Sequence, residues 1–129
     1  MKSLVPRKIM KGNGDKFSLT FDSEEITRGG LVFATPIDIS GWQFSMLVHK
    51  NVEYRCRDLI FQVEGEVPTP ENGVVYFFVP AELTDVKPGT YWYSLLITKP
   101  TGGETLTLSA KYIIAESLNP YFSIYKHKM

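Results

Sequence analysis

Apolar and polar side chains alternate with a period of two residues over much of this sequence, and this alternation constrains the fold most. Phe17, Leu19 and Phe21 alternate with polar neighbours. The same alternation occurs in three further runs, 42–49, 91–98 and 105–114. Because successive side chains of a β-strand point to opposite faces, each run predicts a strand with one buried face. The best helical candidate, 80–86, would make about two turns. The sequence therefore predicts an all-β fold.

Clusters of glycine and proline separate the predicted strands, as turns require. These clusters lie at 12–15, 29–30, 68–73, 87–89 and 100–103. The chain has 129 residues, which is enough for one domain with its own core. About seven strands at this spacing are typical of an antiparallel β-sandwich. We expect the sandwich to span residues 13–116, between an extended basic N-terminal arm (1–12) and an extended aromatic C-terminal arm (117–129).

The charge balance limits the classes of partner. The chain has 14 lysine and arginine residues and 14 aspartate and glutamate residues, so its formal net charge is zero. Nucleic-acid binding normally requires a basic surface, and only residues 1–11 are clearly basic. No apolar run approaches the length that crosses a bilayer. We therefore expect neither a nucleic acid nor a membrane as partner.

Few residues are of the types that carry chemistry. His49 and Cys56 could form a base and a nucleophile, but no orienting third group accompanies them. We interpret His49 as an exposed histidine and Cys56 as an incidental thiol. Glu64 and Glu66 could share one strand face, but Gly65 between them favours a turn. The sequence predicts no catalytic residue, no metal site and no cofactor.

Several stretches resemble one protein family when they are taken in order. They are Gly14-Asp15-Lys16-Phe17-Ser18-Leu19-Thr20-Phe21, Pro36-Ile37-Asp38-Ile39-Ser40-Gly41-Trp42-Gln43-Phe44, Asn72-Gly73-Val74-Val75-Tyr76-Phe77, Pro80-Ala81-Glu82-Leu83-Thr84, Pro88-Gly89-Thr90-Tyr91-Trp92-Tyr93 and Gly102-Gly103-Glu104-Thr105-Leu106. Over residues 13–115 this order resembles the immunoglobulin-like N-terminal domain of tailed-phage upper baseplate proteins and similar small phage virion proteins. The resemblance implies an immunoglobulin-like sandwich and a structural, non-catalytic role in the virion, after synthesis in the host cytoplasm.

Apolar residues also fall on the otherwise polar faces of the predicted strands. A two-sheet sandwich has one inner face per sheet, so these residues need cover from loops, from the C-terminal arm or from another chain. Tyrosine and tryptophan are enriched in the cores of protein interfaces. We predict an assembly interface with other copies of this chain and with other phage virion proteins. Its predicted residues are Leu47, Tyr76, Phe78, Trp92, Leu96, Ile113, Tyr121, Phe122 and Tyr125.

Two functional hypotheses from different classes follow. The first is a non-enzymatic structural subunit of a tailed-phage virion, in a baseplate, neck, tail or decoration position, that forms an oligomer through protein–protein interaction. The alternative is a carbohydrate-binding or adhesion module, in which exposed aromatic residues such as Trp92 and Tyr76 form a platform for a glycan. Loss of glycan binding on replacement of Trp92 would favour the alternative.

Overall fold

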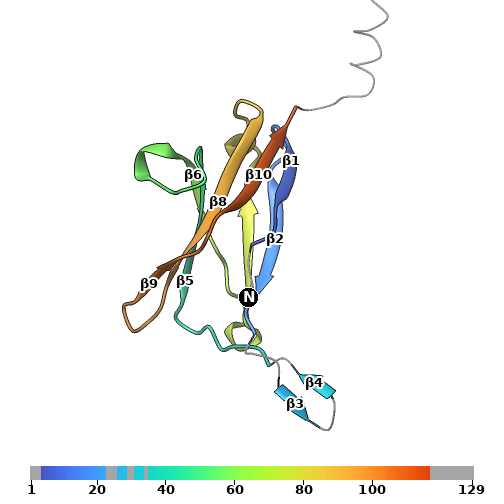
Figure 1. Cartoon of the computed structure of the whole chain (residues 1–129), viewed down its shortest axis with the longest axis vertical. Helices are drawn as coiled ribbons and strands as arrows, with labels where there is room; N and C mark the ends of the chain where they lie inside the picture. The colour runs from blue at the N-terminus through green and yellow to red at the C-terminus, as the bar shows by residue number, and fades with distance from the viewer. Residues whose placement is uncertain (1–3, 23–25, 29–30, 34, 117–129) are drawn as a thin grey trace, which may run out of the picture.

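The computed structural model of this chain describes residues 4–22, 26–28, 31–33 and 35–116. These residues form ten β-strands and three short 3-10 helices, and they contain no α-helix (Figure 1). The predicted all-β sandwich is therefore confirmed. The structure has more strands than the predicted seven because four short strands, β1, β3, β4 and β9, contribute three or four residues each. None of the described segments forms a helix that is long and apolar enough to cross a membrane.

The larger sheet has the strand order β1-β10-β8-β5-β6, and β9 also pairs with β8. Its strands are β1 (Arg7–Met10), β5 (Gln43–His49), β6 (Leu59–Glu64), β8 (Gly89–Thr98), β9 (Glu104–Leu106) and β10 (Ala110–Ala115). All pairs in this sheet are antiparallel except β1, which pairs with β10 in parallel. Within the predicted sandwich, residues 13–116, every strand pair is antiparallel, and the parallel strand β1 precedes that range.

The smaller sheet consists of β2 (Asp15–Thr20) and β7 (Val74–Val79), which pair antiparallel. The strands β3 (Ile26–Arg28) and β4 (Leu31–Phe33) pair only with each other. The 3-10 helices are η1 (Cys56–Asp58), η2 (Pro70–Asn72) and η3 (Ala81–Thr84). The last of these lies within the predicted helical candidate 80–86.

Residues 4–10 belong to the sandwich rather than to an arm. Leu4 is buried in the core, and the hydroxyl of Tyr93 donates a hydrogen bond to the carbonyl of Val5. β1 follows directly and pairs along its length with β10. The predicted arm over 1–12 was therefore wrong for residues 4–12, because backbone pairing with a distant strand cannot be inferred from local composition. The predicted arm over 117–129 lies outside the described residues.

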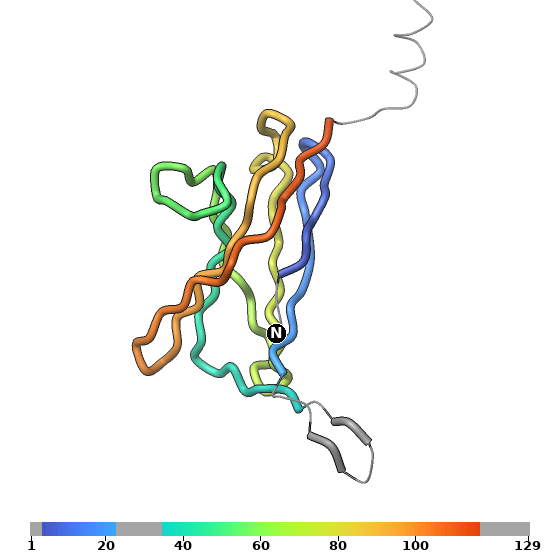
Figure 2. The backbone as a smooth tube through the Cα atoms, viewed as in Figure 1, coloured from blue at the N-terminus to red at the C-terminus, as the bar shows by residue number. Residues whose placement is uncertain are grey.

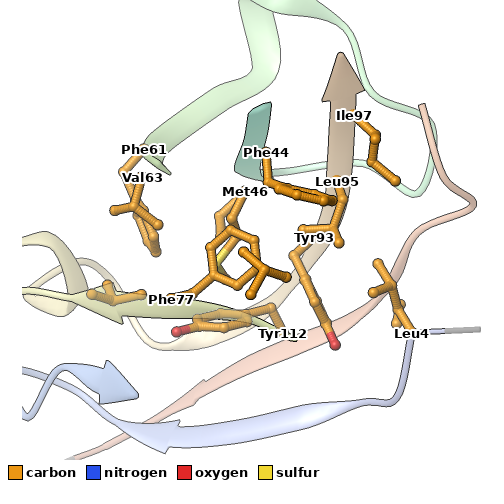
Figure 3. Packing of buried hydrophobic residues seen from close by; sticks show 14 of the residues in the cluster. Leu4, Phe44, Met46, Phe61, Val63, Phe77, Tyr93, Leu95, Ile97 and Tyr112 are labelled. Atoms are coloured by element: carbon orange, nitrogen blue, oxygen red, sulfur yellow. The ribbon is translucent and has the colours of Figure 1, made fainter. Parts of the chain in front are cut away.

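The core lies between the two sheets and follows the predicted alternation (Figure 3). Phe77 of the smaller sheet is fully buried against the larger one. The ring of Phe17 stacks on Phe77 with 5.3 Å between centroids, and it meets the edge of Tyr93 at 6.1 Å. The residues that the larger sheet buries in this core are Phe44, Met46, Val48, Phe61, Val63, Tyr93, Leu95, Ile97, Ala110, Tyr112 and Ile114.

The chain changes sheets immediately after β6, as the tube in Figure 2 shows. The backbone N–H of Gly65 still donates to the carbonyl of Phe44 in the larger sheet, at 2.8 Å. The next residue, Glu66, exchanges two backbone hydrogen bonds with Tyr76 of β7, both 2.8 Å long. A Cβ atom at Gly65 would lie only 2.6 Å from a methyl carbon of Val75. A glycine therefore permits this close crossing and places Glu66 at the edge of the smaller sheet.

A buried polar cluster joins β1, β2 and β10 at the opposite edge. The guanidinium of Arg7 donates two hydrogen bonds to the carboxylate of Asp15, at 2.7 and 2.6 Å, and stacks over the ring of Phe17 at 4.0 Å. The hydroxyl of Tyr112 donates to the same carboxylate at 3.0 Å. Burial raises the pKa of Tyr112 above its ordinary value, so the hydroxyl remains protonated and available as a donor.

Candidate ligand-binding face

The outward side of the β2–β7 sheet carries two neighbouring aromatic side chains that are open to solvent. Tyr76 is 44% exposed and Phe78 is 65% exposed. They alternate along β7 with Val75, Phe77 and Val79, which are buried in the core. The period of two thus divides β7 between a core side and a solvent side, as the pleat of a strand requires.

The pairing register places polar side chains of β2 next to this aromatic pair. Lys16 lies opposite Phe78, and Ser18 lies opposite Tyr76. Both polar residues are exposed. We call this surface the aromatic face, and it consists of Lys16, Ser18, Thr20, Glu66, Pro68, Val74, Tyr76 and Phe78. It combines exposed rings with hydroxyl, ammonium and carboxylate groups.

Two adjoining hollows open on the aromatic face. The larger has a volume of about 420 Å³ and is lined by Lys16, Glu66, Pro68, Tyr76, Phe77 and Phe78. The smaller has a volume of about 50 Å³ and is lined by Pro68, Thr69, Asn72, Val74 and Tyr76. Pro68 and Tyr76 line both hollows, so the two are neighbours on one surface. The volume of the larger hollow falls within the range of about 300 to 1,000 Å³ that is usual for small-molecule sites.

The walls of the hollows are held by backbone hydrogen bonds. Glu66 is fixed beside Tyr76 by the two bonds described above. Beyond Pro68, the helix η2 forms a tight turn in which the N–H of Asn72 donates to the carbonyl of Thr69 at 3.0 Å. Gly73 ends this turn with a φ of 69°. The lining residues therefore lie on β2, on β7 and in the short segment 66–72, rather than on a long loop.

Charged, polar and aromatic residues line the two hollows of this face. The larger hollow is lined by Pro68, by one ammonium group, by one carboxylate and by three aromatic residues, of which Phe77 is itself fully buried. Neither a histidine nor a cysteine lines either hollow, so a nucleophile and base of that kind do not meet there. Among the residues that the structure describes, no three histidine, cysteine, aspartate or glutamate side chains come together as a metal site.

The other predicted interface residues lie elsewhere. Trp92, Leu96 and Ile113 are half-buried, and Trp92 and Leu96 belong to β8 of the larger sheet. The neighbour of Trp92 along the strand, Tyr93, is fully buried in the core, so Trp92 faces away from it. The structure therefore does not bring Trp92 together with Tyr76, and a shared sugar platform of these two residues is excluded. Tyr121, Phe122 and Tyr125 lie outside the described residues.

Leu47 was predicted to need cover from outside the sandwich, and the chain itself provides that cover. Its side chain is only 3% exposed, although it faces away from the core between Met46 and Val48. The loop 50–58 returns over the same side of β5, where Tyr54 packs its ring against His49 at 5.4 Å. Leu47 is therefore not part of an exposed assembly surface.

His49 is fully buried, so its interpretation as an exposed histidine was wrong. Its Nδ1 lies 2.6 Å from the carbonyl oxygen of Asn51, which can only accept, so Nδ1 carries the proton. Its Nε2 then accepts from the hydroxyl of Ser94 at 2.9 Å. Ser94 is buried as well, so this serine and histidine fasten the loop 50–58 to β8 and have no access to a substrate.

The burial of His49 predicts acid sensitivity of the fold. Desolvation lowers the pKa of His49 below its ordinary value of 6.5, although the carbonyl of Asn51 and the charge of Asp58 oppose this. The unfolded chain therefore binds a proton near pH 6.5 while the native chain does not, and stability falls as the pH drops below that value. We expect the urea midpoint to fall more between about pH 7 and pH 5 in the wild type than in His49→Gln.

A control variant separates this effect from general acid denaturation. His127→Gln changes the other histidine of the chain and should retain the acid sensitivity of the wild type. Equal acid sensitivity in His49→Gln and in the wild type would show that burial of this ring does not control the pH dependence.

Sequence reasoning found the two aromatic residues of the candidate site but missed their neighbours. Tyr76 and Phe78 stood out because they fall on the outer face of an apolar strand. Lys16, Glu66 and Asn72 gave no comparable signal, since their position beside β7 depends on the register of β2 and on the change of sheets at 64–66. The cluster 68–73, which was recognised as a turn, was the available indication of Asn72.

Comparisons with known proteins give no family for this chain. No family model matches the sequence, and no curated protein matches it. Among solved structures, CopC from Methylosinus trichosporium OB3b is similar with a TM-score of 0.48 and 8% sequence identity, over 90% of this chain and 89% of that chain.

The expected role as a structural subunit of a tailed-phage virion is corrected at this point. The solved structure named above, CopC from Methylosinus trichosporium OB3b, is not a phage protein, and no comparison gives a virion protein in support of that role. The likeness is too weak to bring a function to this chain. The sequence resemblance to baseplate domains is not tested by these comparisons, and it stays a prediction.

Proposed function

We propose that this chain is a non-catalytic carbohydrate-binding module that holds a glycan against the aromatic face. The observation that carries the proposal is the hollow of about 420 Å³, in which Tyr76 and Phe78 lie between the charged side chains of Lys16 and Glu66. This combination of aromatic rings and polar groups on one surface supports the proposal.

The exposed rings suit the apolar side of a sugar. A pyranose ring has C–H groups on its faces and hydroxyl groups around its rim, so it can lie against an aromatic ring while its hydroxyls stay accessible. The side chain of Phe78 has no polar group and is 65% exposed, which leaves apolar area in contact with water. Covering this ring with a sugar face would remove that area from water.

The surrounding polar groups suit the rim of a sugar. The ammonium of Lys16 can donate to hydroxyl oxygens, and the carboxylate of Glu66 can accept from hydroxyl groups. The hydroxyls of Ser18 and Tyr76 can do both. A mostly apolar site with a few placed polar groups is the usual composition of a small-molecule site, and the polar groups determine orientation and specificity.

Tyr76 and Phe78 alone expose too little area to form a stable protein interface. At about 200 Å² for a fully exposed aromatic side chain, Tyr76 and Phe78 together offer roughly 200 Å². A stable interface buries about 800 Å² per partner. An added peptide strand would also need free backbone groups on β7, and those of Tyr76 are already bonded to Glu66. The geometry therefore favours a small or narrow ligand such as a sugar chain.

The test is glycan binding by the full chain and by a variant without the most exposed ring. We expect the wild type to bind members of an immobilised oligosaccharide library. Titration calorimetry with a soluble form of a bound member should then show that Phe78→Ala binds roughly tenfold more weakly. Truncation of Phe78 removes the stacking surface and leaves the core residues of β7 unchanged.

Leu108→Ala is the matched control, because Leu108 is 92% exposed and lines neither hollow. This variant should bind as the wild type does. The proposal fails if no member of the library binds, or if Phe78→Ala and Leu108→Ala bind equally well.

A further inference from the structure

The aromatic face continues past Tyr76 into the smaller hollow, and we infer that its ligand is a chain of linked sugar rings that runs along β7. This inference rests on the proposed function and adds the length and direction of the ligand. It follows from the placement of the two hollows, since Pro68 and Tyr76 form a wall of each.

The length of the face exceeds a single sugar ring. Phe78 lines the larger hollow and Val74 lines the smaller one, and the two are four residue steps apart along β7. At about 3.3 Å per residue, this separation is about 13 Å. A ligand in contact with both ends must therefore be a chain rather than one ring.

The two hollows differ in the part of the ligand that they can take. The larger hollow, about 420 Å³, has room for a ring. The smaller hollow, about 50 Å³, is several times the space that one water needs, about 10 to 15 Å³, but it is narrow for a ring. It therefore accepts a substituent, such as a hydroxymethyl group, from the ring that follows the one at Tyr76.

The polar groups also change along the face. Lys16 and Glu66 carry opposite charges beside the larger hollow, whereas Thr69 and Asn72 are uncharged groups beside the smaller one. The carboxamide of Asn72 offers both donors and an acceptor to a sugar hydroxyl. The turn of η2 holds this residue in place through its backbone bond to Thr69. Asn72 is thus the residue that contacts the second ring of a bound sugar chain.

The experiment measures affinity against the number of rings. The probes are β-1,4-linked glucose oligomers and β-1,4-linked N-acetylglucosamine oligomers of one to four rings, titrated into the full chain by calorimetry. We expect the affinity of at least one series to rise roughly tenfold from one ring to three. We expect Asn72→Ala to remove this rise.

Two further variants make the result specific. Phe78→Ala should lower the affinity for every member of the bound series by a similar factor, because each member places a sugar ring in the larger hollow. Gln62→Ala removes an exposed amide from β6 that lines neither hollow, and it should change nothing.

The outcomes separate the inference from the proposed function. If one ring binds as tightly as four and Phe78→Ala weakens both, the face binds a single sugar and only the inference is overturned. If additional sugar rings raise the affinity equally in Asn72→Ala and in the wild type, the added rings do not reach the smaller hollow. The inference is then overturned as well. If no probe of either series and no member of the wider library binds, both statements fail.

Discussion

Replacing Gly73 with alanine should lower the free energy of unfolding by about 3 kcal/mol or more. Gly73 has a φ of 69°, in the left-handed region that costs other residues energy. Its Cβ atom would also lie 2.5 Å from the carbonyl oxygen of Phe21 and 2.8 Å from that of Ile37. The carbonyl of Phe21 accepts a hydrogen bond from the N–H of Ile37, and the N–H of Phe21 donates to the carbonyl of Gly73, so this backbone cannot move away cheaply. Urea unfolding at 25 °C would measure the loss.

Gly102→Ala separates the two causes. Gly102 has a similar backbone conformation, with a φ of 89°, but a Cβ atom there would meet nothing within 4 Å. This variant should lose only about 1 kcal/mol, the cost of the conformation alone. An equal loss in both variants would show that the contact with Phe21 and Ile37 is unimportant. Because Gly73 ends the turn that carries Asn72, its replacement should also weaken binding of longer sugars.

Replacing Asp15 with alanine should destabilise the fold by about 3 kcal/mol. The side chain of Asp15 is only 6% exposed, and its carboxylate accepts from both Arg7 and Tyr112. Removal of this carboxylate leaves a guanidinium and a hydroxyl without their partner in a largely buried place. It also breaks the connection between β1, β2 and β10. Urea unfolding would again report the difference.

Asp85→Ala is the control for this prediction. Asp85 forms an ion pair with Lys11 at 3.9 Å, but its side chain is 67% exposed. Exposed pairs contribute little, so this variant should change stability by less than about 0.5 kcal/mol. Similar losses from the two replacements would mean that burial of the Asp15 cluster does not determine its strength.

The inner face of the sandwich could be predicted from the sequence, and the reason is local. Phe44, Met46 and Val48 are buried because the pleat alone assigns alternate side chains to one side. The opposite side could not be predicted in the same way. Leu47 and His49 are both buried there, and the loop 50–58 packs Tyr54 on His49 while its Val52 carbonyl accepts from the hydroxyl of Ser109. Contacts between distant residues of this kind leave no periodic pattern.

The candidate site shows the same division between local and distant information. The outward direction of Tyr76 and Phe78 could be predicted from their place on the outer side of an apolar strand, whereas their exposure is a finding of the structure. The neighbours that give the face its chemistry, Lys16 and Glu66, depend on strand pairing. Lys16 reaches Phe78 only in the observed register of β2, and Glu66 reaches Tyr76 only because Gly65 lets the chain change sheets.

The most direct test of glycan binding at the aromatic face is a map of the amide signals that move during a titration. The full chain, labelled with ¹⁵N, would be titrated with the sugar that binds best and followed by two-dimensional NMR. We expect the shifts to concentrate in β7 and in residues 66–72, while the indole N–H signal of Trp92 stays in place. Shifts centred on Trp92 and β8, or no shifts at saturating sugar, would contradict the account.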